Sequence, residues 1–243
     1  MLVERDIKVR YKQTVLGGAW AVLQPTMSVA VFFLVFGKLA KLPSDDVPYP
    51  VFAFCGMLPW MLFSTSVTSG GQSLVNQQHI LTKVYMPRML IPASCIGSAI
   101  VDMLIGAAVF LALMAWYGLL PGPGILALPL LVLGCVITSL GVSLGLAAMT
   151  VRYRDMRFVI PFLTQIWMYA SPVVYSASIV PEDYRLIAAV NPMFGIISGF
   201  RSAFLGSPWM AAEIAVSMAS GIVLLGLGVV YFRHTEKIFA DVA

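Results

Sequence analysis

Charged side chains are scarce in this sequence. Lysine, arginine, aspartate and glutamate together make up 11% of the 243 residues, whereas a typical soluble domain contains about 25%. Hydrophobic residues make up 60% of the chain. So few charges cannot cover the surface of a water-soluble domain of this length. The composition therefore excludes a soluble globular fold and predicts an all-α integral membrane protein that crosses the bilayer several times.

Cysteine and histidine are also rare. The three cysteines, Cys55, Cys95 and Cys135, all lie in apolar stretches, and they have neither an even count nor the spacing of metal ligands. We interpret them as small core residues. The two histidines, His79 and His234, lie in polar segments far apart in the sequence. No metal site is expected, and because basic and aromatic residues are not interleaved, no nucleic-acid surface is expected either.

The sequence contains no motif for nucleotide hydrolysis or for common hydrolase chemistry. A GxxxxGK[ST] phosphate loop, an HExxH zinc motif and a GxSxG nucleophile motif are all absent. We therefore expect that the chain is not an enzyme. One acid, Asp102, lies well inside an apolar segment, which makes it a candidate for function or for a structural hydrogen bond. Asp102 could serve a proton relay, but a lone acid fits a structural hydrogen bond to a neighbouring span about as well. The absence of intramembrane chains of acids or bases argues against proton coupling as the energy source for transport.

Six segments are long and apolar enough to be membrane spans, which require about 20 residues each. They run over residues 20–39, 51–73, 91–116, 125–151, 158–175 and 211–232. An even number of spans places both termini on one side. That side then holds 11 of the 15 lysines and arginines, and the opposite side holds 4. Because cytoplasmic segments carry the excess of positive charge, both termini are predicted to be cytoplasmic.

Two segments on the predicted cytoplasmic side have features of interaction surfaces. Residues 1–18 form an amphipathic pattern that is typical of a helix lying on the membrane surface, with an apolar stripe that runs beside basic residues. The loop over residues 76–90 contains a short helical pattern in which Leu81, Val84 and Tyr85 accompany Lys83 and Arg88. This pattern could dock into a groove of a cytosolic partner, or its basic residues could serve only to set the topology.

The segment over residues 176–210 is too long for a hairpin and too apolar for a solvated linker. It predicts two short helices that are divided at Asn191-Pro192, because a residue that precedes proline disfavours helical geometry. These helices either re-enter the membrane beside a pathway or lie on its outer face as a cap. In the fourth span, Gly141 and Gly145 form a small-xxx-small pair that would permit close approach of another helix.

Five stretches in this order resemble the membrane subunit of ABC-2 type exporters, and in particular the permeases that export O-antigen, capsule and teichoic acid. They are RDIKVRYKQTVLGGAWAVLQP at residues 5–25, GMLPWMLFSTSV at 56–67, LTKVYMPRMLIP at 81–92, RYRDMRFVIPFLTQIWMYASPVVY at 152–175 and NPM at 191–193. The resemblance covers nearly the whole chain. Any one of these stretches alone, such as RYRD, would be weak.

The resemblance implies partners and roles for particular residues. Two copies of the chain would work with two copies of an ABC ATPase, which would bind ATP and Mg, and a lipid-linked glycan would pass between the two permeases. The coupling helix that contacts the ATPase would contain His79, Ile80, Leu81, Lys83, Val84, Tyr85 and Arg88. Candidates for the lining of the substrate pathway are Trp20, Phe63, Trp167, Tyr169 and Tyr175. Candidates for structural or gating roles are Asp102, Arg154, Asp155, Pro172, Asn191 and Pro192.

The resemblance leads us to expect the permease of a polysaccharide exporter in the bacterial inner membrane. Two alternatives remain at this point. An ABC-2 exporter of a drug or small lipid would share the same plan of spans, and the substrate that stimulates ATP hydrolysis would distinguish it. A membrane-embedded transferase would need polar catalytic residues that converge near one interface, and the acids Asp45, Asp46, Glu182 and Asp183 are all on the predicted outer side and could in principle meet. Ordinary solvated loop residues explain these acids better.

Overall fold

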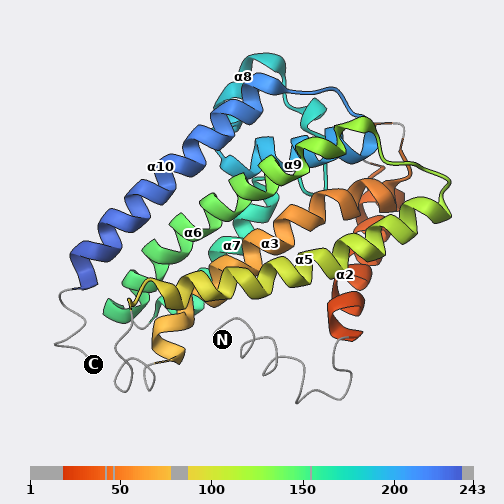
Figure 1. The fold of residues 1–243 in the computed structure, drawn as a ribbon. Helices are drawn as coiled ribbons and strands as arrows, with labels where there is room; N and C mark the ends of the chain where they lie inside the picture. Colours follow the sequence, from red (N-terminus) through yellow and green to blue (C-terminus); the bar gives the residue numbers. More distant parts are fainter. Residues whose placement is uncertain (1–18, 42, 46, 78–86, 154, 237–243) are drawn as a thin grey trace.

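The computed structural model describes residues 19–41, 43–45, 47–77, 87–153 and 155–236, and the side chains of residues 19–21 lie outside this description. Every regular element within these ranges is a helix (Figure 1). The elements are α2 (Ala19–Phe32), η1 (Phe33–Leu39), α3 (Tyr49–Asn76), α5 (Leu90–Trp116), η2 (Pro123–Ala127), α6 (Leu128–Arg152), α7 (Met156–Tyr169), η3 (Ala177–Ile179), α8 (Glu182–Ala188), α9 (Pro192–Leu205) and α10 (Ala211–Glu236).

Five segments of the described chain are long and apolar enough to cross a membrane: α2 with η1, α3, α5, η2 with α6, and α10. Successive helices alternate in direction. As a result, the end of α3, the beginning of α5 and the end of α10 lie at one end of the bundle, which we call the terminal end (Figure 1). Helices α8 and α9 lie at the opposite end, which we call the distal end. The prediction of an all-α membrane protein is confirmed, and so are five of its six predicted spans.

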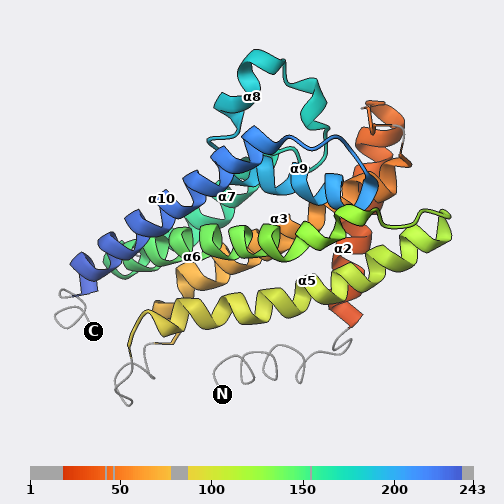
Figure 2. The same ribbon diagram turned by 45° about the horizontal axis from the view of Figure 1, so that its top comes forward.

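Helix α3 forms the centre of the bundle. It packs against α5, α6, α7 and α9, and most of its residues are buried (Figure 2). Two side chains of α6 hydrogen-bond to its backbone: the Ser143 hydroxyl donates to the Ser66 carbonyl at 2.9 Å, and the Cys135 thiol donates to the Pro59 carbonyl at 3.4 Å. All three cysteines are buried and free, as the sequence predicts. These bonds fix the register of α6 along the central helix.

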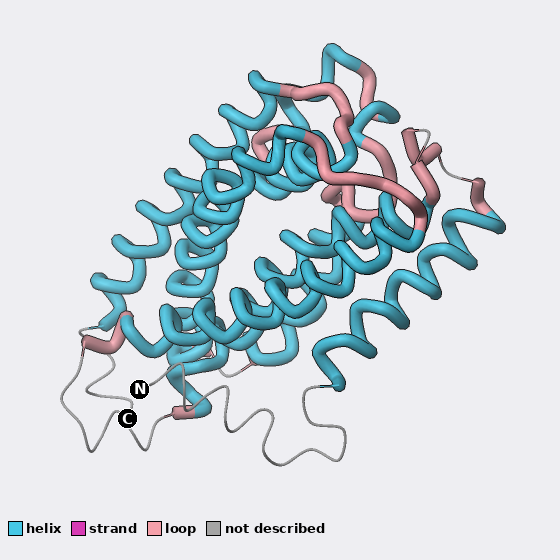
Figure 3. The backbone as a smooth tube through the Cα atoms, turned by 45° about the vertical axis from the view of Figure 1, so that its right-hand side comes forward, coloured by secondary structure: helices cyan, strands magenta, loops and turns pink. Residues whose placement is uncertain are grey.

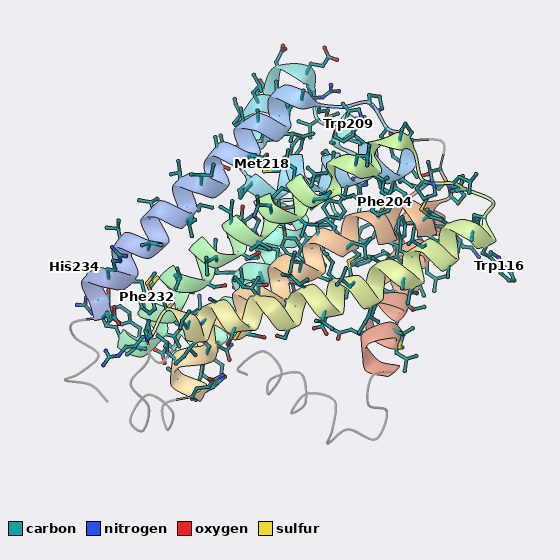
Figure 4. The ribbon with its side chains drawn as sticks, in the orientation of Figure 1. Trp116, Phe204, Trp209, Met218, Phe232 and His234 are labelled. Atoms are coloured by element: carbon teal, nitrogen blue, oxygen red, sulfur yellow. The ribbon has the colours of Figure 1, made fainter. Side chains whose placement is uncertain are left out.

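Glycines bring α6 and α10 into contact along a seam. A Cβ atom at Gly141 would lie 2.5 Å from the Cα of Leu225, and a Cβ at Gly228 would meet the carbonyl of Gly141. Towards the distal end the Met218 side chain fills the notch over Gly134 (Figure 4). Small residues let two helices approach until their backbones touch, which increases van der Waals packing where lipid supplies no hydrophobic driving force. The small-xxx-small pair that the sequence predicts therefore forms a real helix contact.

The prediction for the fifth span is wrong in its extent. We predicted an apolar helix over residues 158–175, but α7 ends at Tyr169 and has only 14 residues. At 1.5 Å per residue this helix covers about 21 Å, less than the hydrocarbon core of about 30 Å. Residues 170–176 continue without regular helix, and Pro172 explains the end because it disfavours helical geometry at Ser171. Figure 3 shows that loops gather at the distal end.

Candidate functional site

The candidate site is the distal end, where the non-helical segment 170–176 meets α3 and α9. Residues 171–174 and Ser176 are buried, whereas Ala170 is exposed and Tyr175 is half-buried, so most of this segment does not meet solvent. In a membrane each unpaired backbone group costs several kcal/mol, so non-helical chain is tolerated only where protein or trapped water satisfies it. The question is therefore which side chains satisfy the carbonyl groups of this segment.

Three side chains donate hydrogen bonds to these carbonyl groups. Two of them come from helices, and the third comes from the residue that caps α9. Arg201 of α9 donates from Nη2 to the Val173 carbonyl at 2.7 Å and from Nη1 to the Tyr175 carbonyl at 3.0 Å. The Tyr49 hydroxyl, at the first residue of α3, donates to the Val174 carbonyl at 2.7 Å. The Asn191 amide donates to the Ala170 carbonyl at 3.2 Å. The segment is thus held by hydrogen bonds that side chains make from elsewhere in the sequence.

Asn191 uses its whole side chain. Its Oδ1 accepts from the Trp167 indole Nε1 at 2.9 Å and from the Met193 backbone N–H at 3.1 Å, while its Nδ2 donates to Ala170 and to the Ser171 hydroxyl at 2.9 Å. The bond to Met193 is a helix N-cap, and Pro192 occupies the first position of α9, where its missing N–H carries no penalty. One residue therefore starts α9, fixes the Trp167 ring and closes the end of α7.

Helices α8 and α9 form a sharply bent pair, with an angle of 115° between them. The division at Asn191-Pro192 that the sequence predicts is confirmed. Ser217 of α10 bridges the bend: its hydroxyl accepts from the Gly195 N–H at 2.9 Å and donates to the Ala189 carbonyl at 2.9 Å. A Cβ at Gly195 would lie 2.6 Å from this oxygen. The bent pair is thus seated directly on the last long helix.

The connection between η1 and α3 closes over the same region. Asp45 has a positive φ of 50°, and its carboxylate accepts from the Ser176 hydroxyl at 2.6 Å and from the Ser178 hydroxyl at 3.2 Å. Asp45 also interacts electrostatically with the buried guanidinium of Arg201. The segments over residues 45–49, around residue 175 and around residue 201 therefore meet at one place, although they are far apart in the sequence.

The pathway candidates fall in different environments. Phe63 has no exposed area and stacks edge-on against Trp167, with ring centroids 5.0 Å apart, so it is a packing residue in this arrangement. Trp167 and Tyr175 are half-buried, and Tyr169 is exposed. Trp20 lies in α2, and its side chain is outside the description. On α7 the exposed side is apolar and aromatic, with Phe158 and Phe162 preceding Tyr169 at helical spacing.

At the terminal end the structure describes only some of the residues that the sequence singles out. The residues from His79 to Tyr85 assigned to the coupling helix lie outside the described residues, as does the interface helix over 1–18 and Arg154. Arg88 lies just before α5, and its Nη1 donates to the carbonyl of Glu236 at 3.0 Å. A cation there also suits the negative end of the α10 dipole. The beginning of α5 is thereby tied to the end of α10.

Two acids that the sequence singles out lie away from the distal cluster. Asp102 is half-buried near the middle of α5, and Asp155 is exposed immediately before α7. Asp155 makes no side-chain cap bond, although a negative charge at a helix N-terminus is favourable. In the described part of the chain no three acids, histidines or cysteines gather as a metal site would require.

Sequence reasoning missed Arg201 and Tyr49, and it named Asp45 only as an outer-side acid for the transferase alternative. Arg201 entered the charge count as an outer-side residue, but it is 3% exposed and lies over the Phe52 ring, 3.7 Å from the centroid. A signal was available, because this arginine interrupts the apolar run MFGIISGFRSAFL with no acid in it. A cation in such a run must find partners elsewhere.

The long apolar helices and the bent pair at the distal end define a polytopic α-helical membrane protein. The chain belongs to the ABC-2 type transporter family, whose model matches residues 1–205. It is 30% identical to the O-antigen export system permease protein RfbA of Myxococcus xanthus over 99% of this chain and 93% of the relative. It is 26% identical to a Klebsiella pneumoniae protein of the same name, over 100% of this chain and 93% of that relative. It is 23% identical to the polysialic acid transport protein KpsM of Escherichia coli, over 96% and 91%.

Proposed function

We propose that this chain is the transmembrane subunit of an ATP-driven exporter that moves a lipid-linked polysaccharide, such as O-antigen, from the cytoplasmic to the outer side of a bacterial inner membrane. The observation that carries the proposal is the end-to-end similarity to permeases named for O-antigen export, which extends over 93% of their length. The similarity to a polysialic acid transport protein supports a polysaccharide as the substrate class.

The proposal requires a separate source of energy, because this sequence has no phosphate loop. Two copies of the chain would assemble with two copies of an ABC ATPase that binds ATP and Mg. The loop over residues 76–90 would seat in the ATPase from the terminal end, which would face the cytoplasm. The charges support this orientation, since Arg88, Arg152, Arg157 and Arg233 of the described residues lie at that end.

The substrate pathway would run between the two copies, along the exposed aromatic side of α7. Sugar rings stack on aromatic faces, and a moving polymer requires contacts that are weak and repeated. Tyr169, with Phe158 and Phe162 on the same side, supplies such contacts, and Trp20 of α2 remains a candidate. Helices α8 and α9, with segment 170–176, would form the outer gate.

The proposal is tested by purifying the tagged chain from its native membranes in mild detergent and assaying for a stoichiometric ATPase. We expect such a partner, with hydrolysis that responds to lipid-linked glycan rather than to small lipids or drugs. A chain that elutes alone, without ATPase activity, would contradict the proposal. A response only to small lipids or drugs would replace polysaccharide export with the alternative substrate class.

Charge reversal of Arg88 examines the coupling loop. We expect Arg88→Glu to reduce recovery of the ATPase about tenfold while the permease still inserts, because the change removes a cation from the docking region and disturbs the tie to α10. Arg233→Glu is the matched control, since Arg233 is exposed on the last turn of α10 at the same end. If Arg88→Glu recovered as much ATPase as the wild type, Arg88 would not be part of the docking surface.

A further inference from the structure

Arg201 occupies a site that is built around a guanidinium group. The side chain is 3% exposed, its Nη atoms donate to the Val173 and Tyr175 carbonyls, and its charge lies on the face of Phe52. Gly56 makes room for it: a Cβ there would lie 2.8 Å from Nη2 and 2.7 Å from the Val173 carbonyl oxygen. Replacement of any of these parts would therefore disturb the position of segment 173–175.

The site is not the arrangement that stability alone would favour. A buried charge carries a large desolvation penalty, and well-packed apolar residues of similar volume are often as stable or more so. Moreover, Arg201 Nε is buried with no hydrogen-bond partner among the described residues. A buried donor without a partner lowers the stability of the folded state. The arginine thus holds segment 173–175 by two strong hydrogen bonds, while its third donor, Nε, has no partner in the part of the chain that the structure describes. A contact that must be released during function would have these properties.

We propose that Arg201 is the positioning residue that locks the outer gate: its two hydrogen bonds pin the non-helical segment 173–175 between α3 and α9, and the gate opens only when they are released. This inference rests on the proposed function, which assigns α8, α9 and segment 170–176 to the gate. Tyr49 is a second, weaker restraint, because its hydroxyl holds the intervening Val174 carbonyl. The lock joins one end of the central helix to the bent helix pair.

The lock predicts leakage without ATP. The permease with its co-purified ATPase is reconstituted into vesicles that contain radiolabelled sucrose, and sucrose release is measured with no nucleotide. We expect Arg201→Gln to release sucrose about tenfold faster than wild type, because removal of hydrogen bonds to a charged group shifts the equilibrium towards the open gate. Basal ATP hydrolysis should remain at the wild-type rate, since its site is in the partner. A change that merely weakened the fold would alter sucrose release and basal ATP hydrolysis together.

Three further variants sharpen the test. Arg201→Lys keeps the charge but loses the planar fork that reaches both carbonyls, so an intermediate leak is expected. Tyr49→Phe removes only the bond to Val174 and should leak less than Arg201→Gln. Arg185→Gln is the matched control on the same end, because Arg185 forms an exposed pair with Glu182 at 3.4 Å and donates to the Val180 carbonyl rather than to segment 173–175. It should leak no more than wild type.

Wild-type tightness in Arg201→Gln would overturn the lock. If Arg201→Gln does not assemble, Tyr49→Phe becomes the test. A Tyr49→Phe variant that leaks no more than wild type would then overturn the proposal. A leak of the same size in Arg185→Gln would also contradict it, because the effect would then be general to the distal end. Failure of the proposed function is distinguishable: wild-type vesicles would then show no glycan-stimulated ATPase activity, whatever the variants do.

Discussion

Gly228→Ala is expected to lower the stability of the permease by about 1–3 kcal/mol, because over-packing of a tight contact forces backbones apart. The added methyl group would meet the carbonyl of Gly141 in α6, and this neighbour is backbone, which cannot turn aside as a flexible side chain can. Separation of α10 from α6 would also disturb Ser217, which seats the bent helix pair. The measurement is the apparent melting temperature of the purified protein in detergent.

Gly226→Ala is the control on the same helix. Gly226 is exposed, and apart from its chain neighbours and the backbone of its own helix no heavy atom lies within 4 Å of the position that its Cβ would take. Alanine favours helix over glycine by about 0.5–1 kcal/mol, so this variant should be neutral or slightly stabilised. If both variants melted at the wild-type temperature, the close contact of α6 and α10 would be refuted.

Loss of Asn191 is expected to have the other large effect. Asn191→Ala removes a helix N-cap, which is worth about 1 kcal/mol, and it leaves the Ala170 carbonyl and the Trp167 indole without their partner. The half-buried Trp167 indole, left without an acceptor, adds about 1–3 kcal/mol, whereas the exposed Ala170 carbonyl adds little, so a total of about 2–4 kcal/mol is expected. Thermal melting gives the stability, and Trp167 fluorescence in a background that lacks the other four tryptophans gives the local change.

Asn191→Asp distinguishes the role of Asn191 as the cap of α9 from its role in holding the gate segment through Ala170. Aspartate caps α9 as well as asparagine does and still accepts from Trp167, but it turns a donor to Ala170 into an oxygen that repels the carbonyl. We expect the Trp167 environment to be kept while export falls. An Asn191→Asp variant with normal export would show that the bond to Ala170 is dispensable.

Much of the architecture could be predicted from local sequence. Five spans, the break at Asn191-Pro192 and the close contact at Gly141 follow from hydropathy, the geometry of proline and the size of glycine, each of which acts within a few residues. The fifth span was predicted too long because hydropathy reads apolar residues equally in helix and in buried loop. The stretch around Val173 and Val174 is apolar, yet it is not helical.

The sequence by itself determined the class of protein, the alternation of the spans and the segregation of charge, since these depend on how each segment partitions between lipid and water. Only the tertiary structure decided that Arg201, Tyr49 and Asn191 converge on segment 170–176. The physical reason is that a carbonyl freed by a broken helix must find a donor at membrane depth, and that donor is chosen by packing in space rather than by position along the chain.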